Sequence, residues 1–284
     1  MTFEINGIKY IRTTDGDGKA SIAINLNPGV YTVITEIEGV KAESVVNVKS
    51  TIEASDIIKM YRNDTQYYAS FLDVKGNDLK NRDVKFNING VTYTRTTNQS
   101  GVARLNINLD PGVYIITAEN PENGELASSK VTVLSLIMEN YDLTKYYKND
   151  SQYTLKVLDD EGNLVGAGAE VVFNINGVFY TRTTDATGYV KLNINLEPGN
   201  YIVTAQYKGC MVSNSITVLS VLETHDTTMK YHNGTKFEAK VLDGQGKAYS
   251  GQNIKFNING VIYERITQDD GISRLDINLM AENT

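Results

Sequence analysis

Apolar and polar residues alternate along short stretches of this chain. Residues 84–88 read Val-Lys-Phe-Asn-Ile, and residues 102–109 repeat the pattern with Ala, Leu, Ile and Leu at every second position. A period of two predicts strands with one buried and one solvated face. No stretch combines the 3.6-residue period of an amphipathic helix with capping residues, so the pattern indicates an all-β protein.

Asn89 and Gly90 follow the first of these strands. Both residue types tolerate the positive φ of a type I′ turn, and Asn-Gly is the strongest short-range hairpin signal. A two-residue turn fixes the pairing of the strands on either side. The predicted opposite pairs are Ile88 with Val91, Phe86 with Tyr93, and Val84 with Arg95.

Residues 52–135 contain five further strand signals. We expect strands near 52–58, 66–73, 102–109, 113–118 and 130–134, in addition to the two of the hairpin. Turn residues separate them, as at Asp73–Asn77, where an Asp can bond its own backbone and a Gly ends the turn. Seven short strands in about 84 residues predict a Greek-key β-sandwich of immunoglobulin type.

The hairpin phrase occurs four times. Its phenylalanines, Phe3, Phe86, Phe173 and Phe256, are 83, 87 and 83 residues apart. This spacing suits a small autonomous domain better than a solenoid unit. We expect four tandem repeats: a partial one at 1–50 with C-terminal strands only, complete ones at 51–135 and 136–220, and a partial one at 221–284 with N-terminal strands only. A piece of a longer array is favoured over strand exchange between chains.

Charge and composition exclude several classes of function. Lys and Arg number 27 against 34 Asp and Glu, which disfavours nucleic acid or an anionic membrane as partner. Cys210 is the single cysteine, so no internal disulfide is possible. No apolar stretch reaches the length of a membrane span, and the first residues do not form a signal peptide. No motif predicts a cofactor, a metal site or a catalytic group beside a partner.

The phrase Leu-x-Pro-Gly-x-Tyr occurs three times, ending at Tyr31, Tyr114 and Tyr201. A Tyr that enters the penultimate strand just after a corner matches the tyrosine corner of these sandwiches, whose hydroxyl bonds back across the loop. An exposed Tyr that stacks on a ligand is the alternative.

Four Asn residues stand in the N-glycosylation pattern Asn-x-Ser/Thr. Asn63, Asn149 and Asn233 occupy the same place in three repeats, and Asn98 lies in a different loop. We expect either glycan acceptors on a surface protein or plain turn residues, since Asn, Asp and Gly all favour turns.

Arg12, Arg95, Arg182 and Arg265 recur on the return strand of the hairpin. The favoured interpretation is a structural Arg that lies at the end of the core or pairs with a local acid. The alternative is a ligand carboxylate or phosphate. Lys59 and Lys145 align with each other, which leaves a Lys–Asn crosslink as a minor alternative, although the next repeat has Met229 there.

The ordered combination of these phrases resembles a known family. The run Tyr-x-Arg-Thr-Thr-x-x-x-Gly-x-x-x-Leu-Asn-Ile-Asn-Leu-x-Pro-Gly-x-Tyr is similar to tandem immunoglobulin-like repeats of prokaryotic surface proteins. It looks closest to adhesin-like proteins of methanogenic archaea, and the resemblance covers essentially the whole chain.

The resemblance implies a secreted or cell-surface location and a projecting, non-enzymatic role. The first hypothesis is a spacer segment that presents a distal binding region or contributes to cell adhesion, with contacts mainly between neighbouring repeats. The second is a module that binds a surface glycan or protein through its loops or through an Asn-rich sheet face, such as Asn106 and Asn108, Asn193 and Asn195, and Asp276 and Asn278. No nucleic acid, membrane insertion or cofactor is expected.

Overall fold

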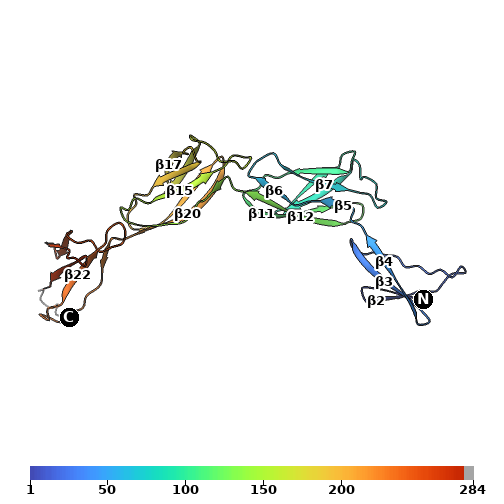
Figure 1. Cartoon of the computed structure of the whole chain (residues 1–284), viewed down its shortest axis with the longest axis horizontal. Coiled ribbons are helices and arrows are strands. Elements are labelled where there is room, and N and C mark those ends of the chain that lie inside the picture. The colour runs from blue at the N-terminus through green and yellow to red at the C-terminus, as the bar shows by residue number, and fades with distance from the viewer. Residues whose placement is uncertain (278–284) are drawn as a thin grey trace. The chain divides into compact units, whose positions relative to one another are not determined.

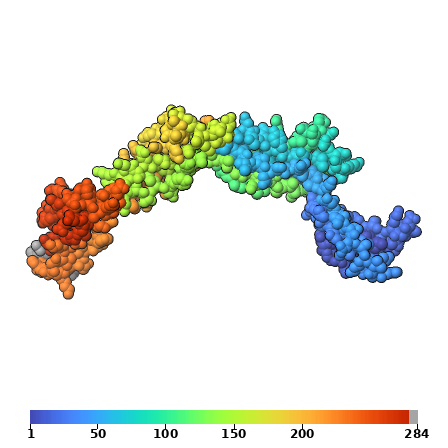
Figure 2. All heavy atoms as spheres, in the orientation of Figure 1, coloured from blue at the N-terminus to red at the C-terminus, as the bar shows by residue number. Residues whose placement is uncertain are grey.

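The computed structural model describes residues 1–277 and is built from strands and loops (Figure 1). The chain divides into two compact units, Met1–Leu134 and a second that begins at Ser135. Within each unit, every repeat is packed from its own contiguous stretch of chain, as the grouping of colours in Figure 2 shows. None of the described residues forms a helix long and apolar enough to cross a membrane.

The second repeat is a complete sandwich of two sheets. The three-stranded sheet has the order β10-β7-β5, and the five-stranded sheet has the order β6-β12-β11-β8-β9. The strands are β5 (Ile52–Ala54), β6 (Ile57–Met60), β7 (Gln66–Phe71), β8 (Asp83–Ile88), β9 (Val91–Thr96), β10 (Val102–Asn106), β11 (Gly112–Glu119) and β12 (Leu126–Leu134). This arrangement confirms the predicted all-β, immunoglobulin-like fold.

The hairpin of the second repeat has the predicted turn and register. Asn89 has φ 52° and Gly90 has φ 76°, both in the left-handed region that a type I′ turn requires. Ile88 lies opposite Val91, and the pairs Phe86–Tyr93 and Val84–Arg95 follow along the two strands. The inward residues of β8 are buried and the outward ones are exposed.

The predicted first strand is wrong in one respect, because it is two strands in two sheets. β5 pairs antiparallel with β7, whereas β6 pairs parallel with β12. The chain crosses between the sheets at Asp56, whose carboxylate accepts a hydrogen bond from the Lys130 amide at 2.7 Å. The repeat therefore has eight strands instead of seven. In addition, β12 begins at Leu126, before the expected residue 130, and β10 ends at Asn106, before the expected residue 109.

The third repeat has the same topology. Its sheets have the orders β13-β15-β18 and β14-β20-β19-β16-β17. Its strands are β13 (Ile137–Met138), β14 (Leu143–Tyr146), β15 (Gln152–Val157), β16 (Glu170–Ile175), β17 (Val178–Thr183), β18 (Tyr189–Asn193), β19 (Gly199–Tyr207) and β20 (Cys210–Leu219).

The first and fourth repeats form parts of this pattern. The first has one sheet of order β2-β1-β3-β4, with β1 (Thr2–Ile5), β2 (Ile8–Ile11), β3 (Gly29–Ile37) and β4 (Val40–Val48). The fourth has a sheet β21-β22-β25 and a hairpin β23-β24. Its strands are β21 (Leu222–Thr224), β22 (Lys236–Val241), β23 (Asn253–Ile258), β24 (Val261–Ile266) and β25 (Ile272–Asp276). Asn278, expected on a polar sheet face, lies outside the described residues.

Residues 19–26 alternate like their counterparts in the other repeats but do not form a strand. In the other repeats the corresponding strand pairs with β7, β15 or β22. The sheet of the first repeat, as described, offers no such partner. Alternation alone therefore does not form a strand, because its backbone groups need a neighbouring ladder.

Aromatic rings fill the core of each sandwich. Tyr67 and Phe86 are fully buried and meet edge to face, with ring centroids 5.7 Å apart. Tyr153 and Phe173 repeat this contact at 6.0 Å in the third repeat. Such pairs add about 0.5–1.5 kcal/mol to the stabilisation from buried area. These cores hold together the two sheets of the second repeat and of the third, and so position the groups described next.

Candidate functional site: strand clamps and repeat junctions

Each connection between repeats contains a serine whose hydroxyl bonds the backbone of the strand that follows. Ser50 accepts a hydrogen bond from the Ile52 amide at 3.0 Å and donates to its carbonyl at 2.6 Å. Ser220 makes the same two bonds to Leu222, and Ser135 accepts from the Ile137 amide. Such local bonds fix the backbone of the two or three residues that join successive strands.

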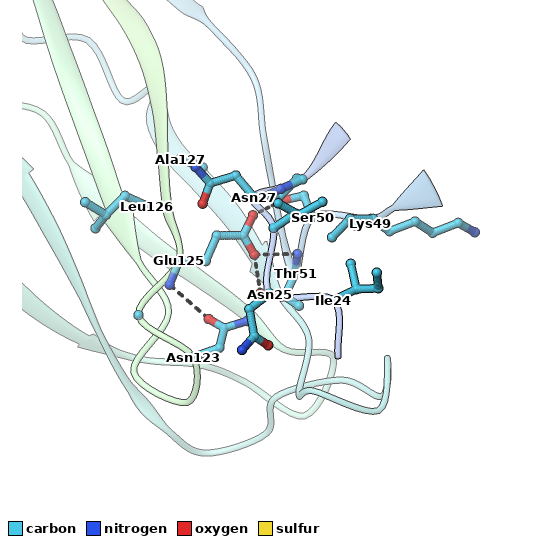
Figure 3. Close-up of a pocket in the computed structure, with 14 residues that line it drawn as sticks. Ile24, Asn25, Asn27, Lys49, Ser50, Thr51, Asn123, Glu125, Leu126 and Ala127 are labelled. Atoms are coloured by element: carbon cyan, nitrogen blue, oxygen red, sulfur yellow. Dashed lines mark hydrogen bonds between the residues drawn. The ribbon is translucent and has the colours of Figure 1, made fainter. Parts of the chain in front are cut away.

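The junction before the second repeat carries a further clamp (Figure 3). The Glu125 carboxylate accepts the Ser50 hydroxyl at 2.5 Å, and the Thr51 amide and hydroxyl at 2.7 and 2.6 Å. The amide groups of Asn120 and Asn123 donate to the Thr51 hydroxyl at 2.8 and 2.9 Å. Glu125 borders an open hollow of about 840 Å³. Its oxygens are committed to the junction, so the geometry indicates a structural carboxylate.

Lys59 forms an internal clamp in the second repeat. Its side chain is 2% exposed, and its ammonium donates to the carbonyls of Asn63, Thr65 and Ile107 at 2.9, 3.0 and 2.9 Å. Burial lowers the pKa of Lys59, and the carboxylate of Asp64 opposes that shift. The ammonium ties the end of β6 to the loop that precedes β7 and to the residue that follows β10.

Lys145 does the same in the third repeat. Its side chain is 5% exposed and donates to the carbonyls of Ser151 and Ile194 at 3.1 and 2.9 Å. Burial again lowers its pKa, opposed by Asp150. The partners of both lysines are backbone carbonyls, which accounts for the alignment of Lys59 with Lys145 without a crosslink to Asn. In the sequence, the alignment of the two lysines was the only sign of this structural role.

In each complete repeat the second strand, which carries the lysine, runs parallel to the last strand. β6 pairs with β12 from Ile57 opposite Val131 to Met60 opposite Leu134, and Tyr61 extends the ladder through a 2.9 Å bond from its amide to the Leu134 carbonyl. In the third repeat β14 pairs in parallel with β20, and the Tyr147 amide bonds the Leu219 carbonyl at 2.9 Å. A pull on the two ends of either repeat therefore loads these bonds in shear.

The three Tyr residues after Pro-Gly bond across their corners. Tyr31, Tyr114 and Tyr201 donate their hydroxyls to the carbonyl four residues earlier, at 2.7, 2.8 and 2.8 Å. The ring passes over the Gly two residues before it, and a Cβ on Gly112 would lie 3.2 Å from the Tyr114 hydroxyl oxygen. The close approach gives a physical reason for the Gly of the phrase.

The four candidate glycan acceptors lie in tight turns. The side-chain oxygen of Asn63 accepts the Thr65 amide at 3.2 Å, and Asn149 and Asn233 accept the amide two residues on at 2.7 and 3.0 Å. Asn98 accepts from Ser100 and Val102. Asn98 and Asn233 are exposed, whereas Asn63 and Asn149 are half-buried. Asn149 also donates its amide to the Gly244 carbonyl at 2.5 Å.

The four recurring Arg residues are exposed and share one contact. Each donates Nη1 to the carbonyl of the preceding residue, at 2.9, 2.7, 2.8 and 2.8 Å for Arg12, Arg95, Arg182 and Arg265. Arg95 and Arg182 also lie over the rings of Tyr93 and Tyr180, at 5.7 and 5.8 Å. Within residues 1–277 none of the four forms an ion pair, so the expected local acid is replaced by a backbone carbonyl.

Cys210 and Glu139 also have structural partners. Cys210 is buried, 3.3 Å from the Ser135 hydroxyl. Glu139 accepts the Tyr189 hydroxyl and pairs with Lys156 at 3.1 Å. These two contacts lower the pKa of Glu139, the Tyr189 hydrogen bond having the larger effect. Among the described residues no three His, Cys, Asp or Glu side chains gather as metal ligands would.

The chain is similar to known proteins in structure but matches none of the curated proteins in sequence. No protein-family model matches the chain, and no curated protein matches it. Solved structures similar to it include a Ca²⁺-stabilized adhesin with which an Antarctic bacterium binds ice, at 15% identity over 98% of this chain and 81% of that one, with a TM-score of 0.21. Others are the titin I9–I11 tandem (14% identity, 77% and 88% covered, TM-score 0.28) and the Bacteroides ovatus protein SGBP-B in complex with a mixed-linkage heptasaccharide (14%, 97% and 80%, TM-score 0.23). At TM-scores below 0.5 these likenesses do not establish a shared overall structure.

Proposed function

We propose that this chain is a non-enzymatic spacer segment of an adhesin-like protein at the cell surface. Its repeats, bounded at residues 51, 136 and 221, are the mechanical units, and their number sets the reach of the molecule. The acidic, solvated surface and the short closed connections support this role. The tyrosine corners serve the fold of the repeats that contain them, and each recurring Arg adds a contact to its own backbone.

The parallel pairing of the second strand with the last strand of each complete repeat carries the proposal. When force acts on the ends of a repeat, β6 and β12 are pulled in opposite directions along their common ladder, so their hydrogen bonds must break together. β14 and β20 are loaded in the same way. Forced unfolding is governed by the unfolding rate, which such a concerted barrier lowers. An array built for extension under load gains from this geometry.

Single-molecule stretching of the whole chain tests the mechanical role. The second and third repeats should give two separate high-force events, each releasing about 30 nm of extended chain for an 85-residue unit. Tyr147→Pro removes the amide that bonds the Leu219 carbonyl and should lower the force of one event only.

Thr181→Ala, an exposed change on the edge strand β17, is the matched control and should leave both forces unchanged. Unfolding at low force in the parent chain, or equal forces in the parent and Tyr147→Pro proteins, would contradict the spacer mechanism.

The surface location is a second part of the proposal, supported by the resemblance to adhesin-like proteins of methanogenic archaea. Antibodies against residues 51–220 should label intact cells of the source organism. Labelling that requires lysis would contradict the surface location.

On such a surface the proposed glycan acceptors are Asn63, Asn98, Asn149 and Asn233. Mass spectrometry of native protein that finds all four unmodified would contradict the proposed glycosylation.

A further inference from the structure

The second repeat has a hollow of about 460 Å³ whose lining residues differ from those at the same place in the third and fourth repeats. It lies where the edge strand β9 comes beside the outward face of β7 and β10. Its walls are Tyr68, Arg95, Thr96, Asn98, Val102 and Arg104. Arg104 and Tyr68 are cross-strand partners, so their side chains stand side by side on that face. The volume is in the range of small-molecule sites.

The hollow holds two guanidinium groups without an acidic partner. Arg95 and Arg104 are both exposed, and neither forms an ion pair with any of residues 1–277. Arg95 spends one of its five donors on the Thr94 carbonyl, which leaves the rest for a ligand. Asp83 contacts the wall of the hollow, but its carboxylate accepts the Thr96 hydroxyl at 2.7 Å and forms no ion pair with either Arg.

Two further groups can contact a ligand. Tyr68 is 53% exposed and offers the face of its ring. Asn98 also lines the hollow, and its oxygen accepts the amides of Ser100 and Val102. Its NH₂ group has no hydrogen bond to any of residues 1–277, so both hydrogens can donate to a ligand. The hollow thus combines positive charge, a flat apolar surface and an amide donor.

The third and fourth repeats neutralise the same position. In the fourth repeat Glu238 replaces Tyr68, and the counterpart of Arg104 is Arg274, which pairs with Glu238 and Asp270 at 2.8 Å each. In the third repeat Thr154 replaces Tyr68 and Asp185 replaces Asn98, beside Lys191 in place of Arg104. Only the second of these three repeats keeps two unpaired guanidinium groups next to an exposed ring.

We propose that this hollow binds a carboxylated sugar, such as a uronic acid unit of an acidic polysaccharide. The planar carboxylate fits the fork of a guanidinium, and Arg95 and Arg104 both present one. The ring of Tyr68 packs against the C–H face of the pyranose, and the Asn98 amide donates to a hydroxyl. Because the chain as a whole carries a net charge of −7, a polyanion needs a local positive site such as this one. This binding is an activity beyond the spacer role.

Calorimetric titration of the whole unglycosylated chain tests the proposal. The probes are tri-galacturonate, the uncharged galactotriose of the same length, and inorganic phosphate. We expect tri-galacturonate to bind and to weaken with added salt, and the other two probes to fail. Arg95→Ala and Arg104→Ala should each lower the affinity for tri-galacturonate about tenfold or more, since each removes charge-assisted hydrogen bonds.

Tyr68→Glu is the sharpest variant, because it installs the neutralising acid of the fourth repeat and should abolish binding. Arg182→Ala, the equivalent change in the third repeat, should have no effect. All four positions are exposed, and protection of the buried Cys210 thiol in Arg182→Ala checks that the third repeat stays folded.

Absence of tri-galacturonate binding, unchanged binding in Tyr68→Glu, or binding of phosphate as tight as that of the sugar would overturn the proposal. None of these results would alter the forces measured on the spacer. A glycan on Asn98 would fill the same hollow, so native protein modified there should not bind the trisaccharide.

Discussion

Replacing Lys145 by methionine should lower the free energy of unfolding of the third repeat and so raise the fraction of molecules in which it is open. Lys145→Met removes the ammonium that donates to the carbonyls of Ser151 and Ile194. Met is the residue that the fourth repeat carries at this position, as Met229, and its side chain is similar in length. The substitution therefore isolates the two hydrogen bonds from the packing of the chain that carries them.

The two bonds set the magnitude. Each buried carbonyl left without a donor costs about 1–3 kcal/mol. The substitution also relieves the burial of a charged ammonium, the same burial that lowers the pKa of Lys145. We expect a net loss of about 2 kcal/mol, which raises the open population of the repeat about 30-fold.

The single thiol provides the assay. Cys210 is the only cysteine and is 1% exposed in the third repeat, so its labelling rate under native conditions reports the opening of that repeat. When reclosing is faster than labelling, the rate follows the open population. Lys59→Met, the same change in the second repeat, is the matched control and should leave the rate unchanged.

Phe173→Ala separates opening of the sandwich from fraying of the hairpin end near Cys210. If Phe173→Ala accelerates labelling and Lys145→Met does not, the lysine clamp contributes nothing and the reasoning is refuted. If neither variant accelerates labelling, the expected opening of the whole repeat is equally wrong, because the thiol is then exposed by local motion.

Three further changes have defined outcomes in the same chain. Phe173→Ala removes a fully buried ring in edge-to-face contact with Tyr153 and should cost about 3–5 kcal/mol, seen as labelling of the thiol at least 100-fold faster. Tyr201→Phe removes the hydroxyl that bonds the Glu197 carbonyl and should cost about 1 kcal/mol, or about fivefold in labelling; an unchanged rate would show that the corner bond adds no stability. The pKa of Glu139 is held below its ordinary 4.5 by its tyrosine and lysine partners, so its contribution to stability is complete above pH 4.5 and is lost as the pH falls through the folded-state pKa. The urea midpoint of the third repeat should fall with acid more steeply in the parent than in Glu139→Gln, and parallel curves would contradict this.

Local chemistry was enough to predict much of the fold. The turn at Asn89-Gly90 depends on two backbone dihedrals that these residue types favour, and a two-residue turn leaves one register for the strands on either side. Alternation with a period of two then decides which side chains face the core, as along β8. The all-β class and the repeat followed from the same local signals.

The candidate sites were predicted less well. The alignment of Lys59 with Lys145 was visible, but a carbonyl such as that of Ile107, 48 residues away, becomes a partner only after the sheets have packed. The recurring Arg was expected at the end of the core or beside a local acid. Arg95 is exposed on the edge strand β9 and bonds the Thr94 carbonyl instead.

Local signals were enough to predict the strand class and the hairpin register, because each rests on residues within a few positions of one another. The period of about 84 residues followed from the recurrence of the hairpin phrase. The tertiary structure alone decided that residues 52–60 divide between two sheets, and that residues 19–26, with the same alternation as their counterparts, form no strand. A strand needs a hydrogen-bonding neighbour, and in this fold that neighbour comes from a distant part of the chain. Only the packed sandwich brings such segments together.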